Sequence, residues 1–170
     1  LDDTFVYEDP ERGWKISRYI PLCKQLDVHD RGELSEAMRI ARELHGSNAA
    51  IDRTFDFYDE SLRYERLLRS RGSEALSVPG FADNVERVRR LHDAFEVEGG
   101  RTCLCHNDFF DLNFLIDGDD KYYLIDWEYA GMADSTQDFG TFVVCCQLSD
   151  AEAEDALSLY LGHEPTERSR

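Results

Sequence analysis

The alternation of hydrophobic and polar positions divides the chain into short strands and amphipathic helices. Residues 4–8 and 14–20 are β-like runs joined by a Pro/Gly turn, which predicts a β-hairpin. Helical spacing of apolar residues predicts helices over about 30–46, 52–71, 81–97, 136–147 and 150–161. Short apolar runs at 102–106, 113–116 and 122–126 predict strands. The pattern therefore predicts an α+β fold that is mainly helical, with one β-hairpin at the N-terminus and another further along the chain.

Two pairs of residues have the spacing of a helix-capping box, in which the first side chain binds a backbone N–H of the helix and the second reaches back. Asp30 with Glu33 precedes the first predicted helix, and Ser149 with Glu152 precedes the last one. Gly46 is suited to end the first helix because glycine adopts the left-handed conformation common after helices.

The polar turn DGDD separates the second and third runs of strand character in the C-terminal half. A turn centred on its middle pairs Asn113 with Leu124 and Asp111 with Asp126. Asn113 and Asp126 are then diagonal neighbours on one face, about 7–8 Å apart at the backbone. Both carry oxygen atoms, the ligands that Mg²⁺ prefers. This register predicts a shared magnesium site, with Asp108 in the preceding loop close enough to meet a substrate hydroxyl.

Composition and charge narrow the class of protein. The 170 residues include 42% hydrophobic and 12% aromatic positions, which suits one compact folded domain. The net charge of -17 repels nucleic acid and anionic membranes, so neither is expected as a partner. A cationic ligand suits this charge, although an acidic surface also serves solubility alone. No run of apolar residues is long enough to span a bilayer. The oligomeric state stays open.

The five cysteines, an odd number, are distributed without any Cys-x-x-Cys pair. This spacing argues against a zinc site or a thioredoxin-like motif. Cys103 and Cys105 alternate within an apolar strand, and Cys145 and Cys146 lie in an apolar helix. We expect buried, reduced thiols of the kind found in cytoplasmic proteins.

The densest group of chemically useful side chains is HNDFFDLN, residues 106–113, followed by Asp126 after the next strand. An aspartate that orients a hydroxyl, together with an amide and a second carboxylate that hold a metal, meets the needs of phosphoryl transfer. Each residue taken alone is also compatible with an ordinary loop. Their grouping across one hairpin favours the functional interpretation.

The segment HNDFFDLNFLID and the later YYLIDWEYAGMADSTQDFGTF resemble the choline/ethanolamine kinase branch of the aminoglycoside-phosphotransferase-like families. The shared pattern is His-x-Asp, four residues, Asn, and later Ile-Asp-Trp-Glu-Tyr-Ala-Gly, over about 35 residues. The resemblance implies a protein-kinase-like C-terminal lobe with a catalytic-loop β-hairpin. Residues 1–21 would be the last upper-lobe hairpin and the hinge. Residues 22–170 would be the catalytic lobe, truncated at its C-terminus.

The resemblance also implies roles for individual residues. Asp108 would be the catalytic base, and Asn113 and Asp126 would hold Mg²⁺. His106 would brace the catalytic loop through its backbone. Asp138 would anchor the same loop by accepting backbone N–H bonds, although an aspartate in the first turn of a helix is also favoured by the helix dipole.

Both substrates have expected binding residues. The hinge backbone expected around the adenine of ATP consists of Arg18, Tyr19 and Ile20. The residues expected to hold an ammonium group, by cation–π contact and charge, are Trp127, Glu128 and Tyr129. For the two aromatic residues, packing in the core remains an alternative.

The function implied is ATP-dependent transfer of the γ-phosphate to the hydroxyl of a small cationic alcohol, with choline first. Ethanolamine, thiamine or another small alcohol are alternatives, as is a kinase-like module that binds without catalysis. Asp111 and Leu112 stand where related choline kinases often have Pro-Gly, which puts the fine geometry of the loop in question. The chain shows no glycine-rich phosphate loop and no suitably placed lysine. We therefore expect activity in a longer parent protein and inactivity in these 170 residues alone.

Overall fold

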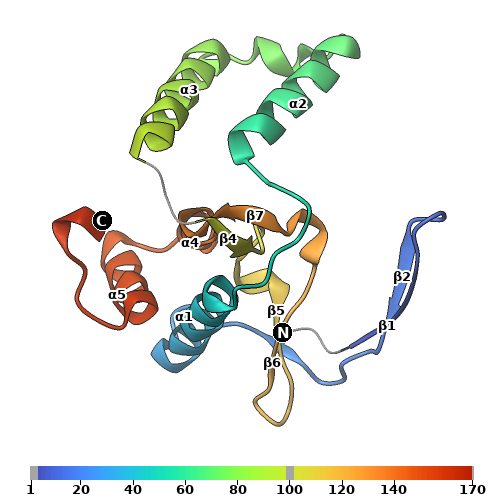
Figure 1. Ribbon diagram of the computed structural model, residues 1–170, viewed down its shortest axis with the longest axis vertical. Coiled ribbons are helices and arrows are strands. Elements are labelled where there is room, and N and C mark those ends of the chain that lie inside the picture. The colour runs from blue at the N-terminus through green and yellow to red at the C-terminus, as the bar shows by residue number, and fades with distance from the viewer. Residues whose placement is uncertain (1–3, 99–101, 170) are drawn as a thin grey trace.

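The computed structural model describes residues 4–98 and 102–169. Figure 1 shows a central body of helices and small sheets, from which two parts extend: a pair of helices and a β-hairpin. The helices of the body are α1 (Arg31–Gly46), α4 (Ser135–Cys145) and α5 (Asp150–Leu161). The outlying pair consists of α2 (Phe57–Ser70) and α3 (Phe81–Glu98). The predicted α+β architecture with a majority of helix is confirmed. Within the described residues, no helix combines the length and the apolar character needed to cross a bilayer.

The strands form three small antiparallel sheets within the described residues. One sheet is the N-terminal hairpin of β1 (Phe5–Asp9) and β2 (Trp14–Ser17). The second has the order β3–β5–β6, comprising β3 (Lys24–Gln25), β5 (Phe114–Ile116) and β6 (Tyr122–Leu124). The third joins β4 (Thr102–Cys105) to β7 (Gly131–Asp134). Short 3₁₀ turns at Glu74–Ser77, Asp111–Asn113, Trp127–Tyr129 and Glu167–Ser169 complete the elements.

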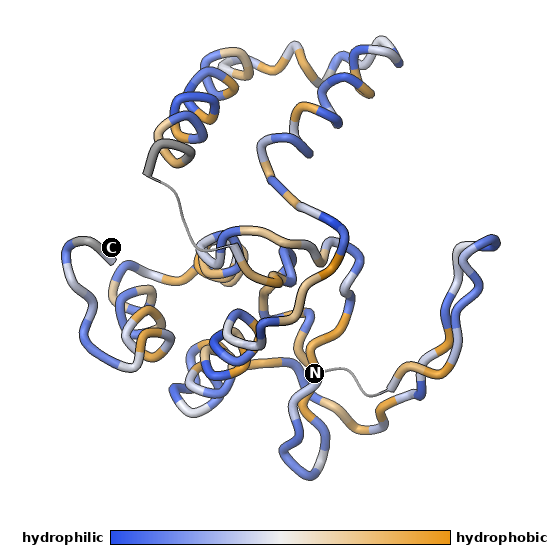
Figure 2. Tube along the Cα trace, viewed as in Figure 1, coloured by the Kyte–Doolittle hydropathy of each residue, from blue (hydrophilic) through white to orange (hydrophobic). Residues whose placement is uncertain are grey.

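The predicted N-terminal hairpin is present and projects from the body (Figure 1). Its strands are joined by a turn in which Gly13 has a φ of 71°, a conformation that glycine adopts without strain. Large apolar side chains on both strands remain exposed: Phe5, Val6, Tyr7, Trp14 and Ile16. Figure 2 shows hydrophilic residues at the tip and along parts of both strands, and hydrophobic residues mainly toward the base of the hairpin.

Helix α1 begins at the predicted N-cap, but the expected capping box is only half formed. The Asp30 carboxylate accepts hydrogen bonds from the backbone N–H of Gly32 and Glu33. Glu33 does not turn back toward Asp30; its carboxylate accepts from the N–H of Asp27 and from Lys24. Glu33 therefore connects the helix to the strand before it. At α5, Ser149 and Glu152 form the complete capping box that the sequence predicts.

The second predicted helix begins later than expected, at Phe57 and not near residue 52. Residues before it are extended because they pair with the start of β7: the Phe55 N–H donates to Met132 O, and the Met132 N–H donates to Arg53 O. Phe55, expected on a helix face, is instead buried in this extended segment. Asp56 then caps α2 by accepting from the N–H of Tyr58 and Asp59.

The expected register of the catalytic-loop hairpin is wrong by one residue. Phe114, not Asn113, pairs with Leu124. The cause is a turn one residue longer than assumed, in which Asp120 takes the left-handed conformation with a φ of 58°. The Asp117 side chain stabilises this turn by accepting from the N–H of Asp119 and Lys121. Asp111 therefore does not lie opposite Asp126; it begins a 3₁₀ turn.

The core lies between α1, α4, α5 and the β3–β5–β6 sheet, and aromatic rings fill its centre. Phe109 is fully buried, with its ring centroid 5.1 Å from that of Phe114 and 5.7 Å from that of Phe142. These residues come from the loop after β4, from β5 and from α4. The core thus fixes the loop that contains the candidate catalytic residues.

The cysteines are all free, and only some are buried as expected. Cys103 and Cys105 on β4 are buried, whereas Cys23 and Cys146 are partly accessible. Cys145, at the C-terminal end of α4, is exposed, contrary to the prediction.

Replacing Gly131 by alanine tests the contact between β7 and the segment before α2. A Cβ atom at this position would lie 2.9 Å from the Cβ of Phe55 and 3.2 Å from its backbone nitrogen, so the two segments must separate. We expect the free energy of unfolding to fall by about 1–3 kcal/mol in urea denaturation. The matched control is Gly140→Ala on α4, where an added Cβ meets nothing within 4 Å. Because alanine favours helix over glycine, this control should raise stability by up to about 1 kcal/mol. Equal effects of the two substitutions would contradict the packing described here.

Candidate active site

A buried carboxylate holds the loop that follows β4. Asp138, in the first turn of α4, has no solvent-exposed surface. Its two oxygens accept the backbone N–H of His106 at 2.9 Å and that of Asn107 at 2.6 Å. The carboxylate also accepts from Nε2 of His45, on α1, at 2.9 Å. The side chain of Asp138 thus holds the backbone of the loop at two consecutive residues.

His106 is fully buried under the same loop. Its Nε2 donates to the carbonyl of Ile125 at 2.8 Å, which connects the loop to the end of the β5–β6 hairpin. Burial lowers the pKa of His106, because the charged imidazolium loses its hydration. The Trp127 ring stands edge-on to the His106 ring, with 4.7 Å between the centroids. The side chain of His106 therefore connects the loop after β4 to the end of the β5–β6 hairpin.

The side chains of Asp108 and Asn113 are hydrogen-bonded to each other. Nδ2 of Asn113 donates to the carboxylate of Asp108 and to its carbonyl oxygen, both at 2.8 Å. With the amide nitrogen bound in this way, the amide oxygen of Asn113 faces away from Asp108. The arrangement leaves that oxygen in position to act as a ligand, while Asp108 remains only partly buried at the loop surface.

The hairpin brings Asp126 to the same region. The Ile125 N–H donates to the carbonyl of Asn113 at 2.9 Å, and Asp126 is the next residue. Asp126 and Asn107 both have positive φ angles, 63° and 62°, in the left-handed region that aspartate and asparagine tolerate better than most residues. Such conformations concentrate at functional sites, where the surrounding structure maintains them. Asp126 is exposed, so its carboxylate is available to a ligand.

The additional carboxylate of Asp111 contacts α4. Its Oδ1 lies 3.7 Å from Sγ of Cys146, which donates to it. Burial, followed by smaller effects that include the charge of Asp111, raises the pKa of Cys146 to about 12. Asp111 therefore has a neighbour that explains its position without a metal.

The residues after Asp126 form a 3₁₀ turn with two kinds of environment. The Trp127 Nε1 donates to the carbonyl of Leu124 at 2.8 Å, and its ring packs against the core. The Tyr129 ring lies 5.8 Å from that of Phe55. A hydrogen bond with Tyr64, on α2, raises the pKa of Tyr129, and the charges of Glu128 and Asp108 act in the same direction. Tyr129 is thus close to the carboxylates of Asp108 and Glu128 and to Tyr64 on α2.

Two adjoining cavities share Asp126. One, of about 390 Å³, is lined by the expected hinge residues: Arg18, Tyr19 and Ile20. The other, of about 520 Å³, lies along the β1–β2 hairpin and reaches Trp127 and Glu128. Lys15 of β2 lines both cavities. The structure therefore brings the expected hinge to the same space as the expected metal ligand.

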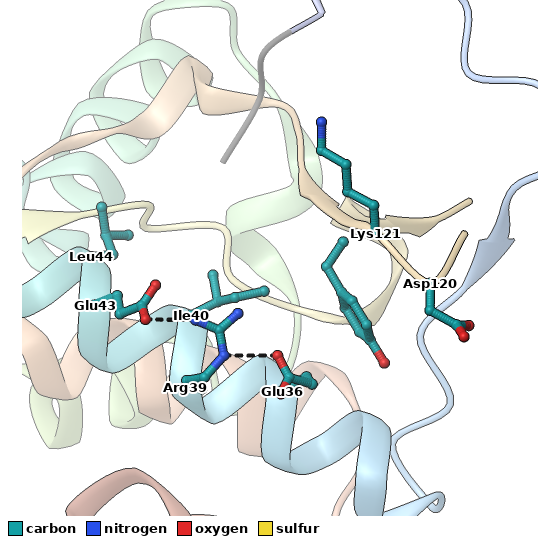
Figure 3. A pocket seen from close by; sticks show the side chains of 8 residues that line it. Glu36, Arg39, Ile40, Glu43, Leu44, Asp120 and Lys121 are labelled. Carbon is teal, nitrogen blue, oxygen red and sulfur yellow. Dashed lines mark hydrogen bonds and ion pairs between the residues drawn. The ribbon is translucent and has the colours of Figure 1, made fainter. Parts of the chain in front are cut away.

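A third cavity, of about 310 Å³, lies between α1 and the β5–β6 turn (Figure 3). Arg39, on the wall of this cavity, forms ion pairs with Glu36 at 2.8 Å and with Glu43 at 2.6 Å. The positive charge of Arg39 is therefore neutralised by residues of its own helix. None of the predicted site residues lines it. The cavities around Asp126 are therefore better placed for the expected chemistry.

Three residues at or behind the site escaped the sequence reasoning. His45 and Tyr64 reach Asp138 and Tyr129 from helices distant in sequence, and no local motif marks them. Lys15, which no sequence motif places at the site, lines both cavities beside Asp126. The alternation of side chains along β2 was the available signal, because it puts Lys15 on the opposite face of the strand from Trp14 and Ile16.

The arrangement of loop, anchor and hairpin agrees with comparison to known proteins. Residues 11–170 match the model of the phosphotransferase enzyme family called APH. The chain belongs to this family. Its members have the protein-kinase-like fold that the sequence resemblance implied.

Relatives of this phosphotransferase chain include LicA and a choline/ethanolamine kinase family protein. Protein LicA of Haemophilus influenzae is 28% identical over 158 residues, which are 89% of this chain and 57% of that protein. A crystal structure of LicA in complex with AMP has a TM-score of 0.85 and 25% identity, covering 99% of this chain and 56% of that one. A choline/ethanolamine kinase family protein from Mesorhizobium loti has a TM-score of 0.78 and 25% identity, with coverages of 98% and 57%. This phosphotransferase chain thus spans little more than half the length of these relatives.

The substitution Asp138→Asn tests the anchor of the loop. An amide offers one acceptor in place of two and turns its N–H₂ toward a backbone donor, so at least one hydrogen bond to the loop is lost. We expect the free energy of unfolding to fall by about 2–3 kcal/mol. The amide protons of His106 and Asn107 should exchange faster with deuterium.

Asp134→Asn is the matched control, because Asp134 caps the same helix and asparagine caps about as well as aspartate. It should change stability by less than about 0.5 kcal/mol. Unchanged exchange at His106 and Asn107 in the Asp138→Asn variant would show that the loop does not depend on this anchor.

Proposed function

We propose that this chain is the catalytic lobe of a kinase that transfers the γ-phosphate of ATP to the hydroxyl of a small cationic alcohol, with choline as the first choice. The observation that carries the proposal is the Asp108–Asn113 pair on a loop anchored by Asp138 and joined to Asp126 by the hairpin. Family membership supports the reaction class. The kinase family of the M. loti relative supports an amino alcohol as acceptor.

The donor set of the site suits Mg²⁺. The amide oxygen of Asn113 and the carboxylate of Asp126 are both hard oxygen ligands, which Mg²⁺ prefers over nitrogen or sulfur. When bound, Mg²⁺ would neutralise charge on the phosphates during transfer. Asn113 and Asp126 would hold it, and the hydrogen bond from Nδ2 of Asn113 to Asp108 keeps the amide oxygen turned to the metal side.

Asp108 is proposed to orient the acceptor hydroxyl and to take its proton. The hydrogen bond to Asn113 fixes one carboxylate oxygen, and the partly exposed carboxylate lies on the side of Tyr129 and Glu128. Phosphoryl transfer needs little more of the protein than such positioning and charge neutralisation.

The two substrates would occupy the two sides of Asp126. The adenine of ATP is assigned to the cavity of about 390 Å³, against the backbone of Arg18, Tyr19 and Ile20. The complex of the relative LicA with AMP supports a nucleotide as one ligand. The ammonium group of the alcohol is assigned to Glu128 and the face of Tyr129. The Trp127 ring packs against the ring of His106. We therefore assign Trp127 to holding the loop in place and not to direct contact with the ammonium group. The acidic surface, with a net charge of -17, attracts a cation over long range.

The proposal is tested by comparing the protein in its full length with the 170-residue chain. Each is incubated with Mg-ATP and choline, ethanolamine, thiamine or a neutral sugar, and phosphorus NMR follows the phosphorylated product. We expect phosphocholine from the full-length protein and none from the isolated chain, which shows neither a glycine-rich phosphate loop nor charge suited to bind ATP alone. Turnover of the sugar in preference to every cationic alcohol would contradict the proposed acceptor.

In the full-length protein, Asp108→Asn should lower kcat by about 10²–10⁴-fold, because the amide keeps the shape and removes the proton acceptor. The KM for ATP should change little. Asp126→Asn should instead raise the Mg²⁺ concentration needed for half-maximal rate. Asp111→Asn is the control, since the Asp111 carboxylate contacts Cys146, and it should leave kcat within a few-fold. Near-normal turnover by Asp108→Asn would exclude it as the base.

A further inference from the structure

Two thiols and an imidazole converge beneath the catalytic loop. Cys103 and Cys105 occupy alternate positions on β4, so both side chains face the same side of the strand. His45 reaches them from the last turn of α1. The potential ligand atoms of the three residues all lie within 4.8 Å of one another, and all three side chains are buried.

The spacing of the sulfurs suits a tetrahedral metal ion. Sγ of Cys103 lies 3.7 Å from Sγ of Cys105. Two thiolates bound to one tetrahedral zinc ion, each at about 2.3 Å, are about 3.8 Å apart. An imidazole nitrogen accompanies a pair of thiolates in several kinds of zinc site. The thiols are thus close enough to share an ion without movement of the strand.

We propose that His45, Cys103 and Cys105 form a binding site for a thiophilic divalent ion such as Zn²⁺. This site is separate from the proposed Mg²⁺ site, whose ligands are oxygens. Mg²⁺ has little affinity for sulfur, so the two ions do not compete for these residues. In the sequence, the absence of a Cys-x-x-Cys pair argued against a zinc site. That argument covers only sites whose two cysteines lie on one local turn. Here the third ligand comes from a distant helix.

The charges at the site balance when the ion binds. Burial, with the nearby charge of Asp138 as a second cause, raises the pKa of Cys105, so the thiol is neutral without metal. Binding one divalent ion releases one proton from each thiol to the solvent. The ion and two thiolates together carry no net charge, which suits a buried position. The free energy of metal–thiolate bonding must offset both deprotonations.

The proposed site is linked to the anchor of the catalytic loop through His45. Its Nε2 donates to Asp138, and its Nδ1 is 2.8 Å from the hydroxyl of Tyr160 on α5. Whichever nitrogen binds the ion gives up one of these hydrogen bonds. Occupation of the site therefore changes the contacts of the same side chain that supports Asp138.

Cobalt substitution tests the proposal. The chelator-treated chain is titrated with Co²⁺ and followed by visible d–d bands, which are intense for tetrahedral sites, and by thiolate-to-cobalt charge-transfer bands. We expect both to saturate at one equivalent and to disappear when Zn²⁺, the tighter binder, is added. Cys103→Ala and Cys105→Ala should each weaken binding by at least about tenfold. Circular dichroism verifies that these variants are folded.

A complementary variant avoids disturbing the core. The triple substitution Cys23→Ala, Cys145→Ala and Cys146→Ala retains only the buried pair, and it should bind one equivalent with an unchanged spectrum. Absence of the bands in the unmodified chain, their retention in Cys103→Ala, or their loss in the triple variant would each overturn the proposal.

Discussion

The carboxylate of Asp138 is the constraint on which the rest of the site depends. A fully buried negative charge must be compensated, and among the described residues it receives three N–H donors from two other parts of the chain. Two of those donors are consecutive backbone groups of the catalytic loop. The third is on α1, so one side chain ties together the first helix, the loop and α4. A shift of the loop would take two of these three donors away from the buried charge.

The rigidity of this anchor is reinforced by packing on the other side of the loop. Phe109 follows Asp108 directly and is fully buried against Phe114 and Phe142. The loop is therefore held by its backbone at His106 and by a side chain at Phe109. Asp108 lies between these two fixed points, which is the placement that a group acting on a substrate requires.

Much of the fold could be predicted because local signals determine it. The side chains of Asp30 and Ser149 fix helix starts by hydrogen bonds within one turn, and such bonds are visible in sequence. The hairpin register could not be predicted because it depends on whether Asp120 adopts a left-handed conformation, which adds one residue to the loop. The start of α2 was misplaced for a different reason. The segment before it is held extended by pairing with β7, about 75 residues further along the chain.

The site was predictable to the extent that its residues lie in one motif. Asp108, Asn113 and Asp126 belong to a single loop and hairpin, so their neighbourhood follows from the sequence. The partners that orient them do not. His45 and Tyr64 come from separate helices, and only the packing of α1 against β4 and of α2 near Tyr129 brings them close. The environment of Asp111, beside Cys146, likewise depends on where α4 lies.

The N-terminal hairpin has exposed aromatic and aliphatic side chains, and its outer strand edges pair with no other strand among residues 4–98 and 102–169. Copies of the chain repel one another through a net charge of -17. Repulsion between exposed charges weakens beyond about 8 Å at physiological salt and over still shorter distances as salt rises. The apolar edges do not weaken in this way, since hydrophobic burial is strengthened by excluded salts such as sulfate. Ionic strength therefore sets the balance between dispersal and self-association of this chain. Such association would pair the strands Phe5–Asp9 and Trp14–Ser17 with those of another copy.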